Sequence, residues 1–204
     1  MLILSPIPSL IKGDSEGSTF FPKKDLTNLG EWMTGVIANS PKTYSLIETY
    51  LKQVMPDFEE MNNEVIRGEF RSLSVRFKQD QADLTLPASQ LSDGEKCFLI
   101  CSLVLAANKA YGPIFCFWDE PDNYLSLTEV GHFVTSLRKA FKDNGQLLIT
   151  SHNPEAIRKF SDETTLLLYR ASHFEPTQIR PLSELQIEGD LIGAIIRDEI
   201  EPAG

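Results

Sequence analysis

The feature that most constrains this chain is a long apolar segment followed by a short apolar run that ends in two acids. Residues 97–107 are almost entirely apolar, so a helix there is apolar nearly all round and buried. Residues 114–118 are continuously apolar, as expected for a strand with helices on both faces. The run ends at Asp119 and Glu120. This order predicts an α/β fold with a mostly parallel sheet flanked by helices.

The turn before this helix has the composition of an anion site. Residues 91–96 are Leu-Ser-Asp-Gly-Glu-Lys. Free N–H groups and the positive end of the helix dipole attract anions at a helix N-terminus. Gly94 lets the backbone approach a ligand closely, and Ser92 adds a hydroxyl. Taken alone, however, the turn is better explained as an ordinary helix N-cap.

The paired acids stand where a buried strand ends. In α/β proteins, ligands bind in the crevice outside the carboxyl ends of the strands. Two carboxylates there are costly without a cation or hydrogen-bond donors nearby. Mg²⁺ keeps its waters and takes few carboxylates, so a pair of acids at this place suits a magnesium ion held through water. The alternative is a capped strand end with solvated acids.

The chain after the acids repeats a strand–helix–strand order. Ser126 and Glu129 have the spacing of a capping box before a helix, and Asn144-Gly145 ends that helix. Residues 146–150 predict the next buried strand, which leads into Thr-Ser-His-Asn at 150–153. The order argues for parallel strands joined by crossover helices. A short helix to about 160, a strand at 164–169 and a tail helix at 190–199 complete the prediction.

The first part of the chain carries weaker signals. Residues 1–25 predict an extended segment broken by Pro and Gly. Residues 12–19 look superficially suited to phosphate, but a phosphate-binding loop needs lysine after its second glycine, so a polar loop is favoured. Helices are predicted at about 26–38 and from 40 to 55, and they form either an inserted arm or lid, or a cover on the sheet. Short strands follow at 65–67, 73–77 and 84–86.

Composition limits the environment and the partners. The net charge of −10 argues against a broad nucleic-acid face on this chain alone. The three cysteines lie in apolar segments, which predicts reduced core thiols and a cytoplasmic protein. No apolar run reaches about 18 residues, so no membrane span is predicted.

With these parts in order, the chain resembles the ATP-binding-cassette (ABC) ATPases. Residues 91–96 resemble their signature motif, and residues 114–120 resemble the Walker B strand with the catalytic glutamate after the aspartate. Residues 122–126 occupy the position of the D-loop, and residues 150–153 resemble the H-loop. The soluble RecF/SMC-like and overcoming-lysogenization-defect (OLD)-like AAA-type branch fits better than the transporters. Asp93, where the family often has glycine, and the bulky Trp118 depart from the usual pattern.

This resemblance implies a role for each site residue. Asp119 holds Mg²⁺, Glu120 polarises the attacking water, and His152 contacts that water and the γ-phosphate. Nucleotide-binding roles fall on the signature and D-loop residues Ser92, Asp93, Gly94, Glu95 and Asp122. In such enzymes the signature motif contacts ATP that is bound to a second head, which implies a homodimer.

No Walker A loop, G-x-x-x-x-G-K-[ST], occurs in this sequence. The chain is therefore expected to correspond to the C-terminal part of such an ATPase and to be inactive alone, with a separate chain or segment supplying Walker A. The predicted division is 1–83 for the helical pair and short strands, and 84–204 for the signature–Walker B–H-loop part of the head. The resemblance implies work on DNA or with a partner nuclease, as in DNA repair or phage defence.

Two other functions stay open from the sequence. The chain could be a non-hydrolysing interaction module or scaffold that donates its signature turn to a partner's nucleotide. It could also bind DNA directly through basic residues around positions 26 to 78. These are Lys23, Lys24, Lys42, Lys52, Arg67, Arg71, Arg76 and Lys78.

Overall fold

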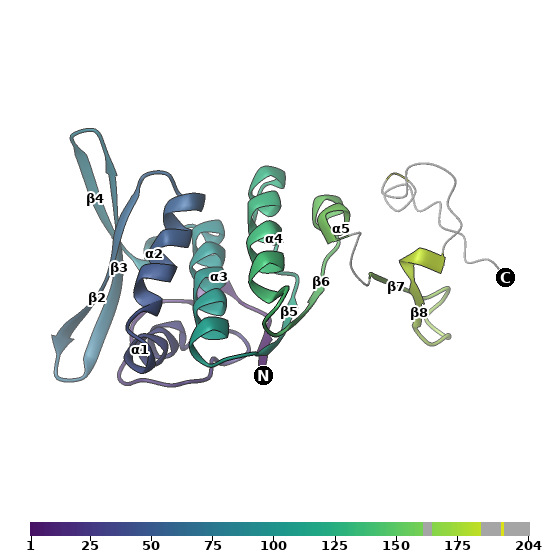
Figure 1. Cartoon of the computed structure of the whole chain (residues 1–204), viewed down its shortest axis with the longest axis horizontal. Helices are drawn as coiled ribbons and strands as arrows, with labels where there is room; N and C mark the ends of the chain where they lie inside the picture. The colour runs from purple at the N-terminus through teal and green to yellow at the C-terminus, as the bar shows by residue number, and fades with distance from the viewer. Residues whose placement is uncertain (161–164, 185–192, 194–204) are drawn as a thin grey trace. The chain divides into compact units, whose positions relative to one another are not determined.

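The structure, a computed structural model, describes residues 1–160, 165–184 and 193. The chain divides into two compact units, residues 1–151 and residues 152–204. The first unit holds a parallel sheet, an antiparallel sheet and four helices (Figure 1). The predicted strands at residues 114–118 and 146–150, which flank the predicted site, both belong to this unit.

The parallel sheet is formed by β1 (Leu2–Leu4), β5 (Phe115–Asp119) and β6 (Gln146–Thr150), in the order β1-β5-β6. Both neighbouring pairs are parallel, which confirms the α/β class. The sequence does not predict β1, because three residues before a proline-rich stretch give too short a pattern. Its register places Leu4 beside Trp118, so the chain begins next to the strand that carries the acids.

Two helices of the first unit lie side by side in one layer over this sheet: α3 (Asp93–Ala110) and α4 (Leu127–Phe141) (Figure 1). Trp118 is fully buried and packs edge-on against Phe133 of α4, with ring centroids 5.4 Å apart. Asn108 near the end of α3 is also buried and donates to the carbonyls of Ala140 and Asn144. The sequence predicts a helix that is apolar all round, and α3 is buried along most of its length.

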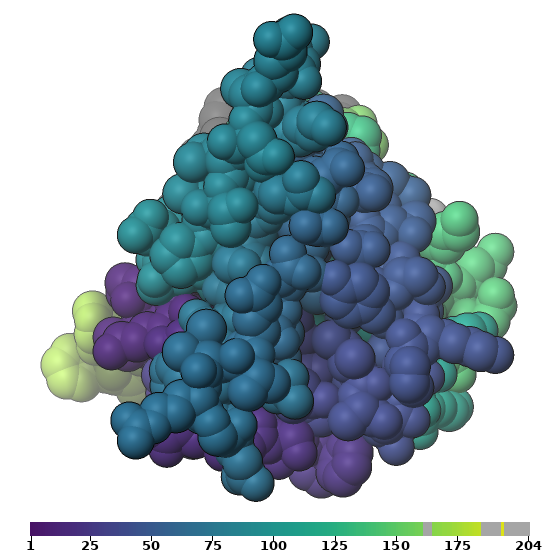
Figure 2. All heavy atoms as spheres, turned by 90° about the vertical axis from the view of Figure 1, so that its left-hand side faces the viewer, coloured from purple at the N-terminus to yellow at the C-terminus, as the bar shows by residue number. Residues whose placement is uncertain are grey.

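The helices α1 (Leu29–Asn39) and α2 (Thr43–Val54) pack against α3. Beyond them lies an antiparallel sheet of β2 (Phe58–Arg67), β3 (Phe70–Gln79) and β4 (Ala82–Pro87), whose strands are longer than the sequence predicts. Figure 2 shows the outer face of this sheet beside α1 and α2. Its inner face supplies apolar core residues, namely Phe58, Met61, Leu73, Val75 and Phe77.

The segment between β1 and α1 is held in place by close packing and by backbone hydrogen bonds. A Cβ at Gly35 of α1 would lie 2.0 Å from the Thr19 carbonyl oxygen, so only glycine allows this approach. Ser15 and Arg71 exchange two backbone hydrogen bonds of 3.0 and 2.8 Å. The stretch 12–19, which superficially suits phosphate, is therefore engaged in contacts with α1 and β3.

The second unit contains α5 (Pro154–Phe160) and a hairpin of β7 (Leu166–Tyr169) and β8 (Gln178–Pro181). The sequence predicts α5 and β7 but not β8. The predicted tail helix at 190–199 lies, apart from Gly193, outside the described residues. Three short 3-10 helices, η1 (Pro8–Leu10), η2 (Ala88–Gln90) and η3 (Leu182–Glu184), complete the elements found in the described parts of the chain.

All three cysteines are buried free thiols, as the sequence predicts. Burial raises the pKa of Cys97 and of Cys116 to about 12, so neither thiol ionises at neutral pH. None of the helices in the described residues is long and apolar enough to cross a bilayer.

Candidate functional site

The acid pair lies at the carboxyl edge of the parallel sheet, with Asp119 as the last residue of β5. Each oxygen of this carboxylate accepts a hydrogen bond from a hydroxyl on a neighbouring strand or its end. Ser5, directly after β1, donates to Oδ2 at 3.1 Å, and Thr150, the last residue of β6, donates to Oδ1 at 2.6 Å. Charge-assisted hydrogen bonds of this kind fix the carboxylate at the carboxyl edge of the sheet.

The next residue, Glu120, turns the chain sharply. Its φ of +45° lies in the left-handed region, which is uncommon for a residue with a side chain. The Glu120 N–H donates to Thr150 Oγ1 at 3.0 Å, and Asn123 Nδ2 donates to Glu120 Oε2 at 2.5 Å. Such a conformation costs about 1–3 kcal/mol and persists only where the surroundings impose it. Because Thr150 Oγ1 also donates to Asp119, this single hydroxyl links both acids.

The turn continues into Asp122, which is 3% exposed. Its Oδ2 accepts a hydrogen bond of 2.7 Å from Ser151 Oγ. The residues after β5 and the residues that end β6 are thus joined at two points, Thr150 and Ser151. These hydrogen bonds hold the turn at residues 120–123 against the edge of the sheet.

The signature turn caps its own helix. Ser92 is the N-cap of α3: its Oγ accepts from the Glu95 N–H at 3.2 Å, and Glu95 Oε2 accepts from the Ser92 N–H at 2.6 Å. The sequence predicts N–H groups here that are available to an anion, but this capping box uses two of them. The amides of Asp93 and Gly94 and the hydroxyl proton of Ser92 stay available as donors.

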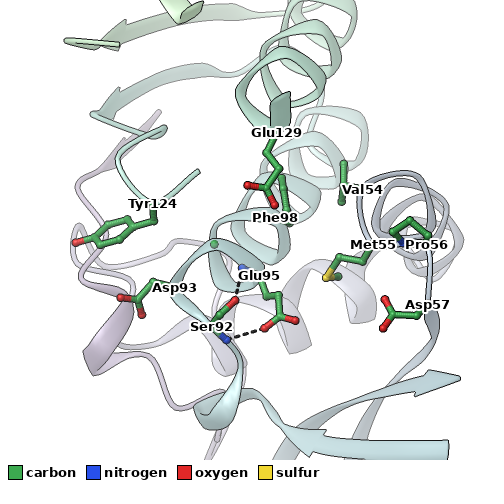
Figure 3. A pocket seen from close by; sticks show the side chains of 11 residues that line it. Val54, Met55, Pro56, Asp57, Ser92, Asp93, Glu95, Phe98, Tyr124 and Glu129 are labelled. Carbon is green, nitrogen blue, oxygen red and sulfur yellow. Dashed lines mark hydrogen bonds between the residues drawn. The ribbon is translucent and has the colours of Figure 1, made fainter. Parts of the chain in front are cut away.

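A pocket of about 580 Å³ opens beside this turn (Figure 3). Its lining residues come from the end of α2, the start of α3, the D-loop position and α4. Four of them are acids and none is Lys, Arg or His; the acids are Asp57, Asp93, Glu95 and Glu129. Their negative charge opposes a phosphate in this pocket unless a cation accompanies it.

Gly94 also has a structural role. A Cβ at this position would lie 3.0 Å from the backbone oxygen of Tyr124, which is closer than side chains normally approach. Tyr124 lines the same pocket and follows Glu120 by only four residues. The turn at residues 91–96 and the D-loop position are therefore packed together.

The remaining predicted residue, His152, is the first residue of the second unit and is exposed. In sequence it follows Thr150 by two positions, and α5 begins two residues after it. The first unit thus brings Asp119, Glu120 and Asp122 together at one sheet edge, while the role predicted for His152 stays a prediction.

The residues around Asp119 fit a magnesium ion that is shared with a nucleotide. Within residues 1–160 and 165–184, no group of three or more His, Cys, Asp and Glu side chains could hold a metal by itself. Mg²⁺ does not require one, because it binds one or two carboxylates and completes its octahedron with water and phosphate oxygens. Asp119 with the hydroxyls of Ser5 and Thr150 suits such a site.

Two of these site residues are not singled out by the sequence. Thr150 is noticed only as part of the Thr-Ser-His-Asn run, and no pattern assigns it to the acids. Ser5 carries no signal, because its contact with Asp119 spans 114 positions and depends on β1 joining the sheet. A strand assignment for Leu2–Leu4 would have been needed to find it.

The fold defines the class of this protein, that of the ABC/SMC-like P-loop ATPase domains. Residues 35–158, more than half of the chain, match the family described as "AAA domain, putative AbiEii toxin, Type IV TA system". The chain belongs to this family. The chain therefore carries an ATPase-type domain, which is the class that the sequence predicts.

Known proteins support the same class. Over 72 residues, which are 35% of this chain, it is 38% identical to the chromosome partition protein Smc of Chlorobaculum tepidum. The Smc head domain of Pyrococcus yayanosii, solved with a coiled coil and joint, superposes with a TM-score of 0.60 at 13% identity over 84% of this chain. The Pyrococcus furiosus Smc head bound to the C-terminal domain of ScpA gives 0.54 at 17% identity over 83% of the chain.

A further structure comes from work on ATP-driven dimerization and DNA-stimulated activation of SMC ATPases. It gives a TM-score of 0.55 at 13% identity and covers 80% of this chain and 96% of that one. The chain spans only 6% of the Chlorobaculum Smc protein, and 31% and 39% of the two Pyrococcus head chains. At these identities the structures establish a shared fold.

Proposed function

We propose that this chain forms the signature and acid-pair part of an ATPase head that hydrolyses ATP between two heads. A separate chain or segment supplies the Walker A loop. The work that hydrolysis drives is on DNA or a partner nuclease, of the DNA-repair or phage-defence type. Family membership supports the ATPase class, and the geometry at Asp119 and Glu120 supports the place of the chemistry.

The observation that carries this proposal is the pair of acids held at the open edge of a parallel sheet. Asp119 is oriented by hydroxyls from both neighbouring strands, and Glu120 is turned out of the strand by its left-handed backbone. If Glu120 only ended a capped strand, it would not need a strained backbone whose N–H donates to Thr150 of β6. Strain of this kind is concentrated at functional sites.

Each residue has a role in the proposed reaction. Bound Mg²⁺ would neutralise charge on the phosphates, and Asp119 would hold it, with Ser5 and Thr150 fixing the carboxylate. The Glu120 carboxylate would orient the attacking water and accept its proton, as positioned bases do in phosphoryl transfer. His152 would contact the γ-phosphate, while Ser92, Asp93, Gly94 and Glu95 would contact nucleotide on a second head.

The test is a substitution at the proposed base. The chain is mixed with a polypeptide that carries the Walker A part of the ATPase, and ATP turnover is measured with Glu120→Gln. Loss of a general base lowers the rate about 10²–10⁴-fold, so the variant should lose at least about 100-fold. Glu69→Gln, which alters an exposed acid in the β2–β3 turn, should keep the wild-type rate. Equal rates for Glu120→Gln and wild type would refute the assignment.

A second function is favoured by one observation, the four carboxylates in the pocket beside the signature turn. They disfavour a phosphate there, as expected if the chain is an interaction module that does not hydrolyse nucleotide. A mixture that forms a stable complex but shows no ATP turnover under any metal condition would support this alternative.

Direct DNA binding by the antiparallel sheet has less support. Arg76 is paired with Glu60 at 2.9 Å and with Asp83 at 3.1 Å, so its charge is largely offset. These contacts raise the pKa of Arg76 and lower that of Glu60. We expect no DNA binding by the isolated chain at physiological salt in a salt-dependent shift assay.

A further inference from the structure

Two phenylalanines lie exposed beside two lysines in the segment between β1 and α1. Phe20 is 52% exposed and Phe21 is 64% exposed, and the side chains of Lys23 and Lys24 are exposed as well. We refer to residues 20–24 as the aromatic–basic loop. Single apolar side chains at a surface are ordinary, but adjacent exposed rings are a feature of interaction surfaces, in which aromatic residues are enriched.

Hydrogen bonds to its backbone order the aromatic–basic loop. Asn28, which is 7% exposed, donates to the Phe21 carbonyl at 3.3 Å and accepts from the Lys23 N–H at 2.7 Å. The Lys24 carbonyl accepts from the N–H of Ser5, directly after β1, at 2.8 Å. Because these bonds already fix the backbone, a partner that binds the loop does not have to order it, which favours binding.

The same loop places positive charge on the surface of an acidic chain, whose net charge is −10. The acid that follows it, Asp25, is partly buried, and its Oδ1 accepts from the Thr27 N–H at 3.1 Å and from the Thr27 hydroxyl at 2.9 Å. The carboxylate of Asp25 is thus engaged on its own side of the loop. Complementary charges orient partners at interfaces, so the loop fits an apolar surface that is surrounded by acids.

The pocket beside the turn at residues 91–96 has this chemistry. Its apolar surface is provided by Val54, Met55, Pro56, Phe98 and Tyr124. Its charged residues are the four acids named above, and Figure 3 shows Met55 between the side chains of Asp57 and Glu95. The volume of about 580 Å³ is in the range of sites that hold organic ligands, so an aromatic side chain fits.

We propose that the aromatic–basic loop of one copy of this chain binds in the acidic pocket of a second copy. Within one copy, loop and pocket lie at opposite ends of α3. Phe20 packs edge-on against Tyr111, the C-cap of α3, with ring centroids 6.1 Å apart, whereas the pocket includes Ser92 at the start of this helix. Because α3 has 18 residues and is about 27 Å long, the loop does not reach the pocket of its own chain. The contact therefore joins two copies head to tail.

This self-association goes beyond the proposed function, because it requires neither a nucleotide nor a Walker A loop. The pocket is lined in part by Ser92, Asp93, Gly94 and Glu95, to which the proposed function assigns contacts with nucleotide on a second head. A loop that is docked in the pocket covers these residues. Copies joined head to tail therefore cannot place them against a nucleotide at the same time.

The first test is sedimentation velocity of the full chain over a range of protein concentrations at physiological salt. The wild-type chain should form species larger than the monomer as its concentration rises. Phe21→Ser removes an aromatic anchor and should weaken this association at least about 30-fold, as loss of a hot-spot residue does. Phe174→Ser is the matched control, because Phe174 is fully exposed in the second unit, and it should associate like wild type.

The second test reverses charges on the two surfaces separately. Lys23→Glu combined with Lys24→Glu makes the loop acidic, and Asp57→Lys places a cation in the pocket, so each variant alone should associate at least about tenfold more weakly than wild type. When the two are mixed, the intact loop of the Asp57→Lys chain meets the intact pocket of the other chain. They should form a one-to-one complex that grows no further. Glu69→Lys, at an exposed acid in the β2–β3 turn, is the control and should behave like wild type.

The outcomes separate this inference from the proposed function. Unchanged urea midpoints show that the variants fold. A wild-type chain that stays monomeric at every concentration, equal association of Phe21→Ser and Phe174→Ser, or charge variants that form no complex with each other overturns the head-to-tail contact, even if the chain takes part in ATP hydrolysis. A one-to-one complex of the two charge variants supports the contact, even if no ATP is hydrolysed when the Walker A part is added.

Discussion

Replacing Thr150 with valine removes one hydroxyl that serves both acids. Valine keeps the shape of the side chain but can neither donate to Asp119 Oδ1, 2.6 Å away, nor accept from the Glu120 N–H at 3.0 Å. A hydrogen bond to a charged group contributes about 1.5–3 kcal/mol, and an unsatisfied part-buried amide costs about 1–3 kcal/mol. Water replaces some of each bond at this part-buried site. We therefore expect a loss of about 2 kcal/mol in the free energy of unfolding.

The assay is urea unfolding followed by the fluorescence of the buried tryptophans, one of which, Trp118, precedes Asp119. Thr150→Ser keeps the hydroxyl and should recover most of the stability. Thr135→Val is the matched control, because its hydroxyl bonds only to the Gly131 carbonyl on the exposed side of α4. In the reconstituted ATPase, Thr150→Val should also lower turnover at temperatures where it is folded. A Thr150→Val midpoint equal to that of Thr135→Val would show that this hydroxyl does not hold the acids.

Two further predictions concern packing and ionisation. Gly94→Ala should lower the free energy of unfolding by about 1–3 kcal/mol, as overpacking does, because the new Cβ would meet the backbone oxygen of Tyr124. Gly17→Ala is the control, because the space around Gly17 is open. Equal urea midpoints for the two variants would contradict the contact at Gly94. Burial raises the pKa of Cys97 and Cys116 from 9.0 to about 12, so the folded state keeps protons that the unfolded state loses. Stability should be fully present below pH 9 and fall between pH 9 and 12, by up to about 1.4 kcal/mol per pH unit for each thiol. A urea midpoint that does not fall from pH 8 to pH 10.5 would contradict this.

The part of the fold near the acids can be predicted from sequence because its signals are local. The capping-box spacing of Ser126 and Glu129 marks the start of α4, and the box forms; Ser92, a candidate N-cap, starts α3. The apolar run before Asp119 is long enough to define a strand. These patterns depend on neighbours in sequence, so they can be recognised without knowledge of the tertiary structure.

The features that the sequence does not reveal depend on distant contacts. β1 has only three residues, and Ser5 reaches Asp119 only because that strand pairs with β5. Likewise, the exposure of Phe115 on β5 cannot be recognised from the sequence, because a continuously apolar strand has the same pattern whether one face or both are covered. The capping of the signature turn by Glu95 shows the opposite problem, since a local pattern there serves the helix as well as a ligand.

We propose that this chain holds the acid pair of an ATP site but lacks the groups that hold the phosphates. The most direct test is calorimetric titration of ATP with Mg²⁺ into the chain alone and into its mixture with a polypeptide that carries the Walker A part of the ATPase. We expect no binding tighter than about 1 mM for the chain alone, and Mg²⁺-dependent binding by the mixture. Tight, Mg²⁺-dependent binding by the chain alone would contradict it.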